Sequence, residues 1–153
     1  MFLAIAKLLK ILVARDGIEP PTPAFSGPLT ESPKWFGISR SCLTVFVPGE
    51  GRILFSYAPN QCDHPYNEIG PIYIHERECQ PYTNYDAFPL ELRTRRPITL
   101  RCYKSDGMMI DGELVGQRPV EAVIEKLFEN HQIKYLHART ASVGCYIARI
   151  ERA

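Results

Sequence analysis

The sequence of 153 residues lacks a surplus of charge of either sign. It contains 18 lysine and arginine residues and 17 aspartate and glutamate residues, which gives a formal net charge of +1 at pH 7. Proteins that bind the phosphate backbone of nucleic acids, or an anionic membrane surface, usually carry a strong basic field. This composition provides no such field, so we expect neither a nucleic acid nor a membrane as partner.

The chain also lacks an apolar segment long enough to span a bilayer. Its most hydrophobic stretch, residues 1–15, is interrupted by Lys7 and Lys10, whereas a membrane-spanning helix needs about 20 apolar residues. No basic residue precedes the stretch and no cleavage motif of small residues follows it, so it lacks the pattern of a secretory signal peptide. The stretch is typical of a weak amphipathic helix.

Neither a disulfide framework nor a familiar catalytic motif is present. The cysteines are Cys42, Cys62, Cys79, Cys102 and Cys145. This odd number at scattered positions is typical of reduced thiols, so we predict a cytoplasmic protein. No Walker loop, dinucleotide-binding glycine fingerprint, Gly-x-Ser-x-Gly elbow or His-Glu-x-x-His pair occurs, which excludes the enzyme classes that depend on these motifs.

Residues 15–33 contain five of the thirteen prolines and no periodic apolar pattern. Such a stretch predicts an extended linker. The four residues at positions 17–20 are also encoded by the antisense strand of a transfer RNA T-arm, which suggests the hypothesis that the first 33 residues or so are a spurious translation. We divide the chain into an N-terminal segment, residues 1–38, consisting of a weak helix and a proline-rich linker, and a single domain, residues 39–153.

The domain combines strand patterns with one amphipathic helix. Apolar residues at positions 120, 123, 124, 127 and 128 repeat at helical spacing, which predicts a helix over about residues 118–130. Segments rich in β-branched and aromatic residues predict strands. These segments are residues 42–47, 52–58, 70–76, 98–104, 108–115, 134–139 and 145–152. We predict an α+β fold, a mostly antiparallel sheet built of hairpins with the main helix packed on one face.

Three blocks of sequence carry a family resemblance. They are PYNEIGPIYIHEREC at 65–79, ITLRCYKSDGMMIDGELV at 98–115 and YLHARTASVGCYIARIER at 135–152. Together they resemble the bacterial family called domain of unknown function 1203, over about residues 39–153. The resemblance implies a small bacterial protein and brings no known activity. Relatives have a Cys-x-x-Cys-like start where this chain reads SRSC, so Ser39 stands in the place of the first cysteine.

Cys42, His75 and Cys79 are candidate metal ligands. Thiolates and imidazole are ligands that zinc accepts, and His-x-x-x-Cys at the end of a predicted strand can be joined by a cysteine from another hairpin. With a serine at position 39 the chain supplies three protein ligands, which leaves either a catalytic pattern completed by water or a decayed site. The alternative is that Cys42 is a small buried hydrophobic residue and His75 a polar residue at a strand end.

His137 and Cys145 are candidates for nucleophilic catalysis. A final hairpin that turns at Ser142 pairs Arg139 with Cys145 and places His137 diagonally across from the thiol. The face that carries this pair is predicted to hold Tyr135, His137, Arg139, Cys145, Ile147 and Arg149. The opposite, apolar face is predicted to hold Leu136, Ala138, Tyr146, Ala148 and Ile150. The alternative is that both candidates are ordinary packed strand residues.

A wider polar face is the last candidate. Period-two alternation places Arg101 and Tyr103 on one face of their strand. If this strand lies near the final hairpin, they join His137 and Arg139 in a binding surface for a small anionic ligand. An ordinary solvated sheet face has the same composition. The first functional hypothesis is therefore a small-ligand binding or interaction module that uses this face. The alternative is a small metal- or thiol-dependent enzyme that uses His75, Cys79, His137 and Cys145.

Overall fold

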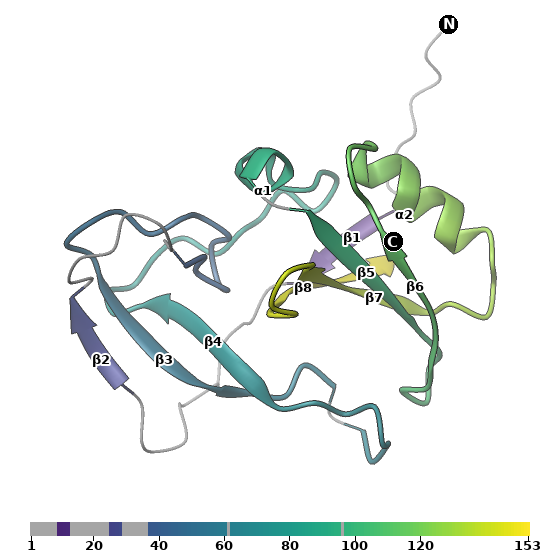
Figure 1. Cartoon of the computed structure of the whole chain (residues 1–153), viewed down its shortest axis with the longest axis horizontal. Coiled ribbons are helices and arrows are strands. Elements are labelled where there is room, and N and C mark those ends of the chain that lie inside the picture. Colours follow the sequence, from purple (N-terminus) through teal and green to yellow (C-terminus); the bar gives the residue numbers. More distant parts are fainter. Residues whose placement is uncertain (1–8, 13–24, 29–36, 61, 96) are drawn as a thin grey trace, which may run out of the picture.

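The computed structural model describes residues 9–12, 25–28, 37–60, 62–95 and 97–153. Within these ranges eight strands form two antiparallel sheets, accompanied by two helices (Figure 1). The prediction of an α+β fold with mostly antiparallel strands is confirmed, although the strands form two sheets instead of one. No helix in the described ranges has the length and hydropathy needed to cross a membrane.

The larger sheet has five strands. Their order across the sheet is β1 (Leu9–Leu12), β8 (Tyr146–Arg152), β7 (Tyr135–Thr140), β5 (Ile98–Tyr103) and β6 (Met109–Leu114). The β5–β6 hairpin forms where the Asp-Gly pair predicts it. Asp106 accepts a hydrogen bond from the backbone N–H of Met108, and Gly107 takes a φ of +91° that other residues rarely adopt.

Helix α2 (Val120–Phe128) covers one face of the larger sheet, as its apolar stripe predicts. Its buried side chains pack with those of the sheet into one hydrophobic core. The helix contributes Val120, Val123, Ile124 and Phe128, and the sheet contributes among others Leu100, Cys102, Leu136, Ala138 and Ile150. Burying each large apolar side chain contributes about 1.5–3 kcal/mol. This core therefore fixes which face of the sheet is left for polar residues.

The smaller sheet lies on the side of the larger sheet away from α2 (Figure 1). Its order is β2 (Phe25–Pro28), β3 (Gly51–Tyr57) and β4 (Gly70–His75). Phe55 and Ile72 of this sheet pack with Tyr146 of β8 in a second, smaller hydrophobic cluster. The run LELR at residues 90–93 predicts a single helical turn, and helix α1 (Leu90–Arg95) forms there, in the irregular region that leads to β5. Strand β7 lies between α2 and the second sheet, and all six of its residues are therefore buried.

The turn sequence PGEG at residues 48–51 predicts that residues 42–47 and 52–58 pair as a hairpin, and this prediction is wrong. Strand β3 forms, but it pairs with β2 and β4. Residues 39–44 make a tight turn instead, closed by hydrogen bonds from Ser39 N–H to the Thr44 carbonyl (2.9 Å) and from Leu43 N–H to the Ser39 carbonyl (3.0 Å). Leu43 takes a φ of +58° in this turn, a conformation that interrupts an extended strand.

Two described pieces of the N-terminal segment also differ from expectation. Residues 9–12 form a strand, not part of a weak helix, and residues 25–28 form a strand, not part of a linker. Each pairs with the edge of a sheet, where unpaired backbone groups accept an added strand even when its own propensity is weak. The proline at position 28 is tolerated because β2 is itself an edge strand. The rest of the predicted helix and linker lies outside the described residues.

The last hairpin has a different register from the predicted one. Arg139 was expected to face Cys145, but it pairs with Tyr146, and His137 pairs with Arg149. The connecting turn is closed by hydrogen bonds between residues 140 and 145 and between residues 140 and 144. The pairing is therefore shifted by one residue at the turn.

A β-bulge further along the hairpin then increases the shift to two residues, so that His137 pairs with Arg149 instead of Ile147. The register changes after Ala138, which leaves Ile147 as the extra residue of β8. Ile147 and Ala148 both join the core beneath α2, and Tyr146 packs against the second sheet. The expected faces of Tyr146 and Ile147 are thus wrong, because one inserted residue exchanges the faces of its neighbours.

Candidate functional site

Cys42, His75 and Cys79 lie together at one end of the smaller sheet. One ligand atom from each residue lies within 4.8 Å of the ligand atoms of the other two. The three side chains come from three segments, the 39–44 turn, the last residue of β4 and the loop that follows β4. The structure therefore assembles the three candidate metal ligands that the sequence suggested.

Backbone hydrogen bonds hold these three segments in place. Ser39 forms a parallel bridge with Tyr73 of β4, and the N–H of Arg40 donates to the Tyr73 carbonyl at 2.8 Å. The N–H of Tyr82 donates to the Ser41 carbonyl at 2.9 Å, which attaches the Cys79 loop to the turn. Because backbone contacts set this arrangement, the three ligands are already close before any ion binds.

Hydroxyl groups surround the two thiols. Ser41 Oγ lies 3.0 Å from Cys79 Sγ, and Thr44 Oγ1 lies 3.0 Å from Cys42 Sγ. Burial opposes ionisation of Cys42, but hydrogen bonds from Ser39 and Thr44 outweigh it and lower the pKa of the thiol. Burial raises the pKa of Cys79, and the proximity of Cys42 adds to this effect. Ionisation is therefore favoured at Cys42 over Cys79, and a second thiolate needs a compensating positive charge such as a cation.

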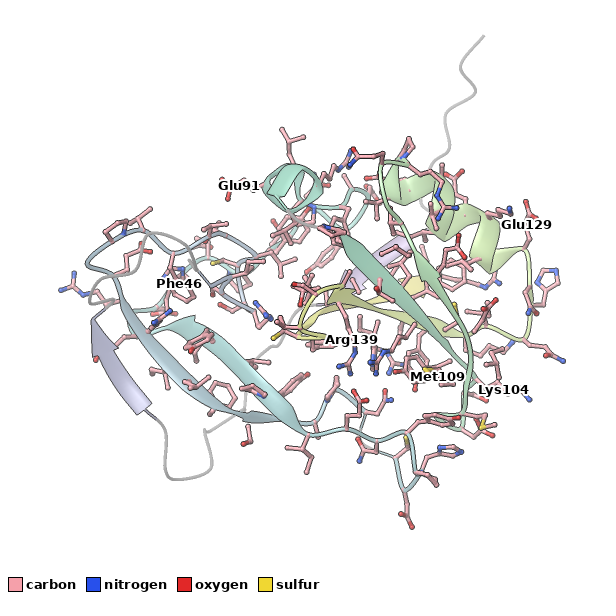
Figure 2. All side chains as sticks on the ribbon, in the orientation of Figure 1. Phe46, Glu91, Lys104, Met109, Glu129 and Arg139 are labelled. Carbon is pink, nitrogen blue, oxygen red and sulfur yellow. The ribbon has the colours of Figure 1, made fainter. Side chains whose placement is uncertain are left out.

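His75 completes the cluster on its more open side. Its Nε2 lies 3.5 Å from Thr44 Oγ1, and its ring packs against Phe46 with 4.6 Å between centroids. Figure 2 labels Phe46 near this end of the smaller sheet. His75 and Cys79 are partly exposed, whereas Ser39 is fully buried. Solvent can therefore reach the cluster from the side of His75 and Cys79.

The spacing of the three ligand atoms is compatible with zinc. With zinc–sulfur bonds of about 2.3 Å and zinc–nitrogen bonds of about 2.0 Å, neighbouring ligands of a tetrahedral site are about 3.5–3.8 Å apart. The observed limit of 4.8 Å needs a contraction of about an ångström or less, which side-chain rotation can provide. Ser39 hydrogen-bonds with both Cys42 and Cys79, so its hydroxyl lies beside the two sulfur ligands.

The four candidate residues of the polar face lie on one face of the larger sheet. Arg101 pairs with His137, Tyr103 pairs with Tyr135, and Arg139 pairs with a threonine of β5. The face is not solvated, because the second sheet and the segment before β4 cover it. Tyr103 and His137 are 1% and 0% exposed, and Arg139 is 7% exposed. Figure 2 shows Arg139 between the two sheets.

Glu68, from the segment that precedes β4, neutralises part of this face. Its two carboxylate oxygens contact Arg101 Nη1 and Arg139 Nη1, each at 2.8 Å. Burial opposes its ionisation, but the hydrogen bond from Arg101 and the charges of both arginines lower the pKa of Glu68. A carboxylate of the chain itself thus occupies the face predicted to bind an anionic ligand.

His137 is buried in an aromatic environment. The rings of Tyr103, Tyr135 and Tyr146 surround it, with centroid distances of 4.6, 5.3 and 5.2 Å. Neither ring nitrogen has a hydrogen-bond partner among the described residues. Burial, followed by the charges of the nearby arginines, lowers the pKa of His137 to about 3. The imidazole is therefore neutral at pH 7.

The structure does not join His137 to Cys145. Because both nitrogens of His137 lack partners, no hydrogen bond links them to the thiol. Cys145 instead lines a separate cavity of about 470 Å³ with Arg40 and Val143. The thiolate–imidazolium pair suggested by the predicted hairpin register is thus not formed.

Sequence reasoning missed part of both clusters. Nothing in the spacing of the charged residues marks Glu68 as the partner of Arg101 and Arg139, because that pairing depends on how the two sheets pack. The hydroxyls of Ser41 and Thr44 were missed as well, although the hydroxyl-rich run from Ser39 to Thr44 was a usable signal.

The comparisons with known proteins give the family of the chain and no activity. No curated protein and no solved structure matches it. A family model described as a protein of unknown function, DUF1203, matches residues 38–152. That range runs from the turn that carries Cys42 to the end of β8, so it includes both clusters. The chain therefore belongs to the DUF1203 family.

Proposed function

We propose that this chain is a zinc-binding protein whose metal is held by Cys42, His75 and Cys79. The observation that carries the proposal is the mutual distance of at most 4.8 Å among the three ligand atoms. Three segments must fold together to produce it. Chance proximity is a weaker explanation, since backbone hydrogen bonds fix each segment relative to the others.

The chemistry of the ligands favours zinc over other common ions. Two thiolates and one imidazole form a borderline-soft set that zinc binds in a tetrahedral arrangement. Calcium and magnesium prefer oxygen ligands, and iron–sulfur clusters use more thiolates than this site offers. The lowered pKa of Cys42 supports the same assignment, because zinc binds the thiolate.

The fourth coordination position remains exchangeable in this proposal. Ser39 hydrogen-bonds with both thiols, but a neutral serine hydroxyl is not among the usual zinc ligands. Water or an oxygen or sulfur atom of a substrate completes the set. Three protein ligands and one exchangeable ligand are the arrangement of catalytic zinc, which lowers the pKa of bound water and polarises substrate carbonyls. The favoured role is therefore that of a metal-dependent enzyme.

We also propose the bacterial cytoplasm as the location. Zinc binding requires Cys42 and Cys79 to be reduced, and all five cysteines are free thiols in the structure. A reducing compartment keeps them so. The balanced charge of the chain supports the absence of nucleic-acid and membrane partners.

Metal analysis of the purified protein tests this proposal. The untagged chain is prepared under reducing conditions, and its zinc is measured by mass spectrometry of the elements. We expect about one equivalent of zinc, as for a single mononuclear site. Cys42→Ser and Cys79→Ser should each lose most of it. Cys145→Ser is the matched control, because Cys145 is also a partly exposed free thiol but lies outside the cluster.

Two results would contradict the proposal. One is equal zinc content in all four proteins, which would place the metal elsewhere. The other is a protein without zinc in which Cys42 and Cys79 form a disulfide even under reducing conditions. Thiol titration of the same samples separates these outcomes, since a disulfide removes two reactive thiols.

A further inference from the structure

Glu68 bridges two arginines that come from neighbouring strands. Its Oε1 contacts Arg101 on β5 and its Oε2 contacts Arg139 on β7, both at 2.8 Å. The side chains of the two arginines are 29% and 9% exposed, while that of Glu68 is 47% exposed. The positive side of this contact is therefore mostly enclosed by the sheet, and the negative side is mostly open.

The enclosed side has more positive charge than Glu68 compensates. Two guanidinium groups share one carboxylate, which leaves one positive charge, and the nearby Arg149 is already paired with Glu151 at 2.6 Å. In addition, the Nε of Arg139 is buried and has no hydrogen-bond partner among the described residues. A buried donor without an acceptor is unfavourable. The uncompensated positive charge is better matched by a ligand with more negative charge than a carboxylate.

His137 adds to this unused donor capacity. It is fully buried, is the pairing partner of Arg101, and has two ring nitrogens without partners. A neutral imidazole carries one N–H, so His137 offers a second unused donor on the same face. Two buried polar groups without partners on one face indicate an absent ligand or water better than they indicate a packed core.

We propose that Arg101 and Arg139 bind the phosphate group of a small molecule, and that Glu68 occupies this site until phosphate displaces it. A phosphate monoester carries a charge of about −1.5 to −2 at pH 7 and three acceptor oxygens. Two of these oxygens replace those of Glu68, and the additional negative charge compensates the positive charge that Glu68 leaves on the two arginines. The site shares no residue with the Cys42–His75–Cys79 cluster, so the proposal does not rest on zinc binding.

Displacement of Glu68 has a low structural cost. The side chains of Asn67, Glu68 and Ile69 are all exposed, and Ile69 is 72% exposed. Movement of this segment therefore uncovers little buried apolar surface. The free energy needed to open such an exposed segment locally is a small fraction of the free energy of global unfolding. The main cost is the loss of two charge-assisted hydrogen bonds, and phosphate restores both.

Calorimetric titration with inorganic phosphate at pH 7.5 tests this inference. The variant Glu68→Gln removes the competing charge and keeps the shape of the side chain. It should bind phosphate at least about tenfold more tightly than the natural chain, since a difference of 1.4 kcal/mol is a factor of ten. Glu113→Gln is the matched control, because Glu113 forms an exposed ion pair with Arg118 at 2.6 Å on the edge strand. Its phosphate affinity should equal that of the natural chain.

A second variant and a second anion complete the test. Adding Arg101→Gln to Glu68→Gln should abolish binding, while the thermal unfolding of the double variant shows that it remains folded. Acetate should bind the Glu68→Gln variant more weakly than phosphate, because it carries one negative charge where phosphate carries nearly two. Absence of phosphate binding to Glu68→Gln at millimolar concentration would overturn the inference. Acetate binding as tight as phosphate would overturn the assignment to phosphate.

Discussion

Cys42 Sγ lies within 4.8 Å of a ring nitrogen of His75, although the thiol comes from a turn and the imidazole from the end of β4. The bridge between Ser39 and Tyr73 produces this relationship, because it holds the turn against β4 two residues before His75. The same turn is tied to the larger sheet by Arg40, whose Nε donates to the carbonyl of Tyr146. The metal-ligand cluster is thus part of the connection between the two sheets.

The substitution Ser39→Cys should convert the three-ligand site into a closed four-ligand site. Ser39 is fully buried and hydrogen-bonds with both thiols, so a sulfur atom at this position can reach the same ion. We expect zinc affinity to rise by more than about tenfold, since an added thiolate bond is worth more than 1.4 kcal/mol. Competition with a chromogenic chelator measures the change. Ser56→Cys, which adds an exposed thiol on β3, is the control, and equal affinities for the two variants would contradict the assigned geometry.

Removal of zinc by a chelator should lower the thermal stability of the natural chain. A ligand that binds only the folded state adds about 4 kcal/mol at a thousandfold excess over its dissociation constant. The metal connects the 39–44 turn, β4 and the Cys79 loop, so all three should loosen together. Calorimetric melting curves with and without chelator measure this effect. Cys79→Ser should show no response, and a response as large as that of the natural chain would place the stabilising metal at other ligands.

His137 should make the protein less stable as the pH falls below 6.5. Its pKa is about 3 in the folded state and 6.5 in the unfolded state, so between these values the unfolded chain binds a proton that the folded chain does not. Stability is then lost with falling pH, by about 2 kcal/mol between pH 7 and pH 5 from this residue alone. His137→Phe should remove this part of the pH dependence and remain within about 1 kcal/mol of the natural chain at pH 7, because no hydrogen bond is lost.

Denaturant unfolding of both proteins at pH 7 and pH 5 measures this difference. The stability gap between them should change by about 2 kcal/mol in favour of His137→Phe at the lower pH. A gap that does not change with pH would mean that His137 is protonated in the folded protein. It would then have an acceptor that the structure does not contain.

The sequence predicts helix α2 and strands β5 to β8 of the larger sheet well, but it misses strand β1 and predicts the pairing of the strands less well. Val120, Val123 and Ile124 repeat at helical spacing, and Asp106-Gly107 marks a turn, so helix α2 and the β5–β6 hairpin follow from local signals. The register of the last hairpin does not follow, because the bulge at Ile147 depends on packing on both faces of β8. The spacing of residues within one strand does not show where an extra residue is needed for packing in the two hydrophobic clusters on either face of β8.

The metal-ligand cluster and the arginine face also differ in how far the sequence predicts them. Cys42, His75 and Cys79 could be grouped from the sequence because their residue types share one chemistry. Strand alternation places His137 and Arg139 on one face of β7 and Arg101 on one face of β5. That the two strands are neighbours, which joins these faces, is shown by the structure. The burial of the arginine face could not be predicted, because it requires knowing that the second sheet and Glu68 cover the face. Contacts between sheets, unlike faces of strands, leave no period in the sequence.

Zinc K-edge X-ray absorption of the purified, reduced protein tests the central claim most directly. The account predicts a first shell of two sulfur atoms at about 2.3 Å, one imidazole nitrogen at about 2.0 Å and one further light atom. Adding Ser39→Cys should change this shell to three sulfur atoms and one nitrogen. A shell of oxygen and nitrogen atoms without sulfur, or a shell that is unchanged by Cys79→Ser, would contradict the assignment of the metal to Cys42, His75 and Cys79.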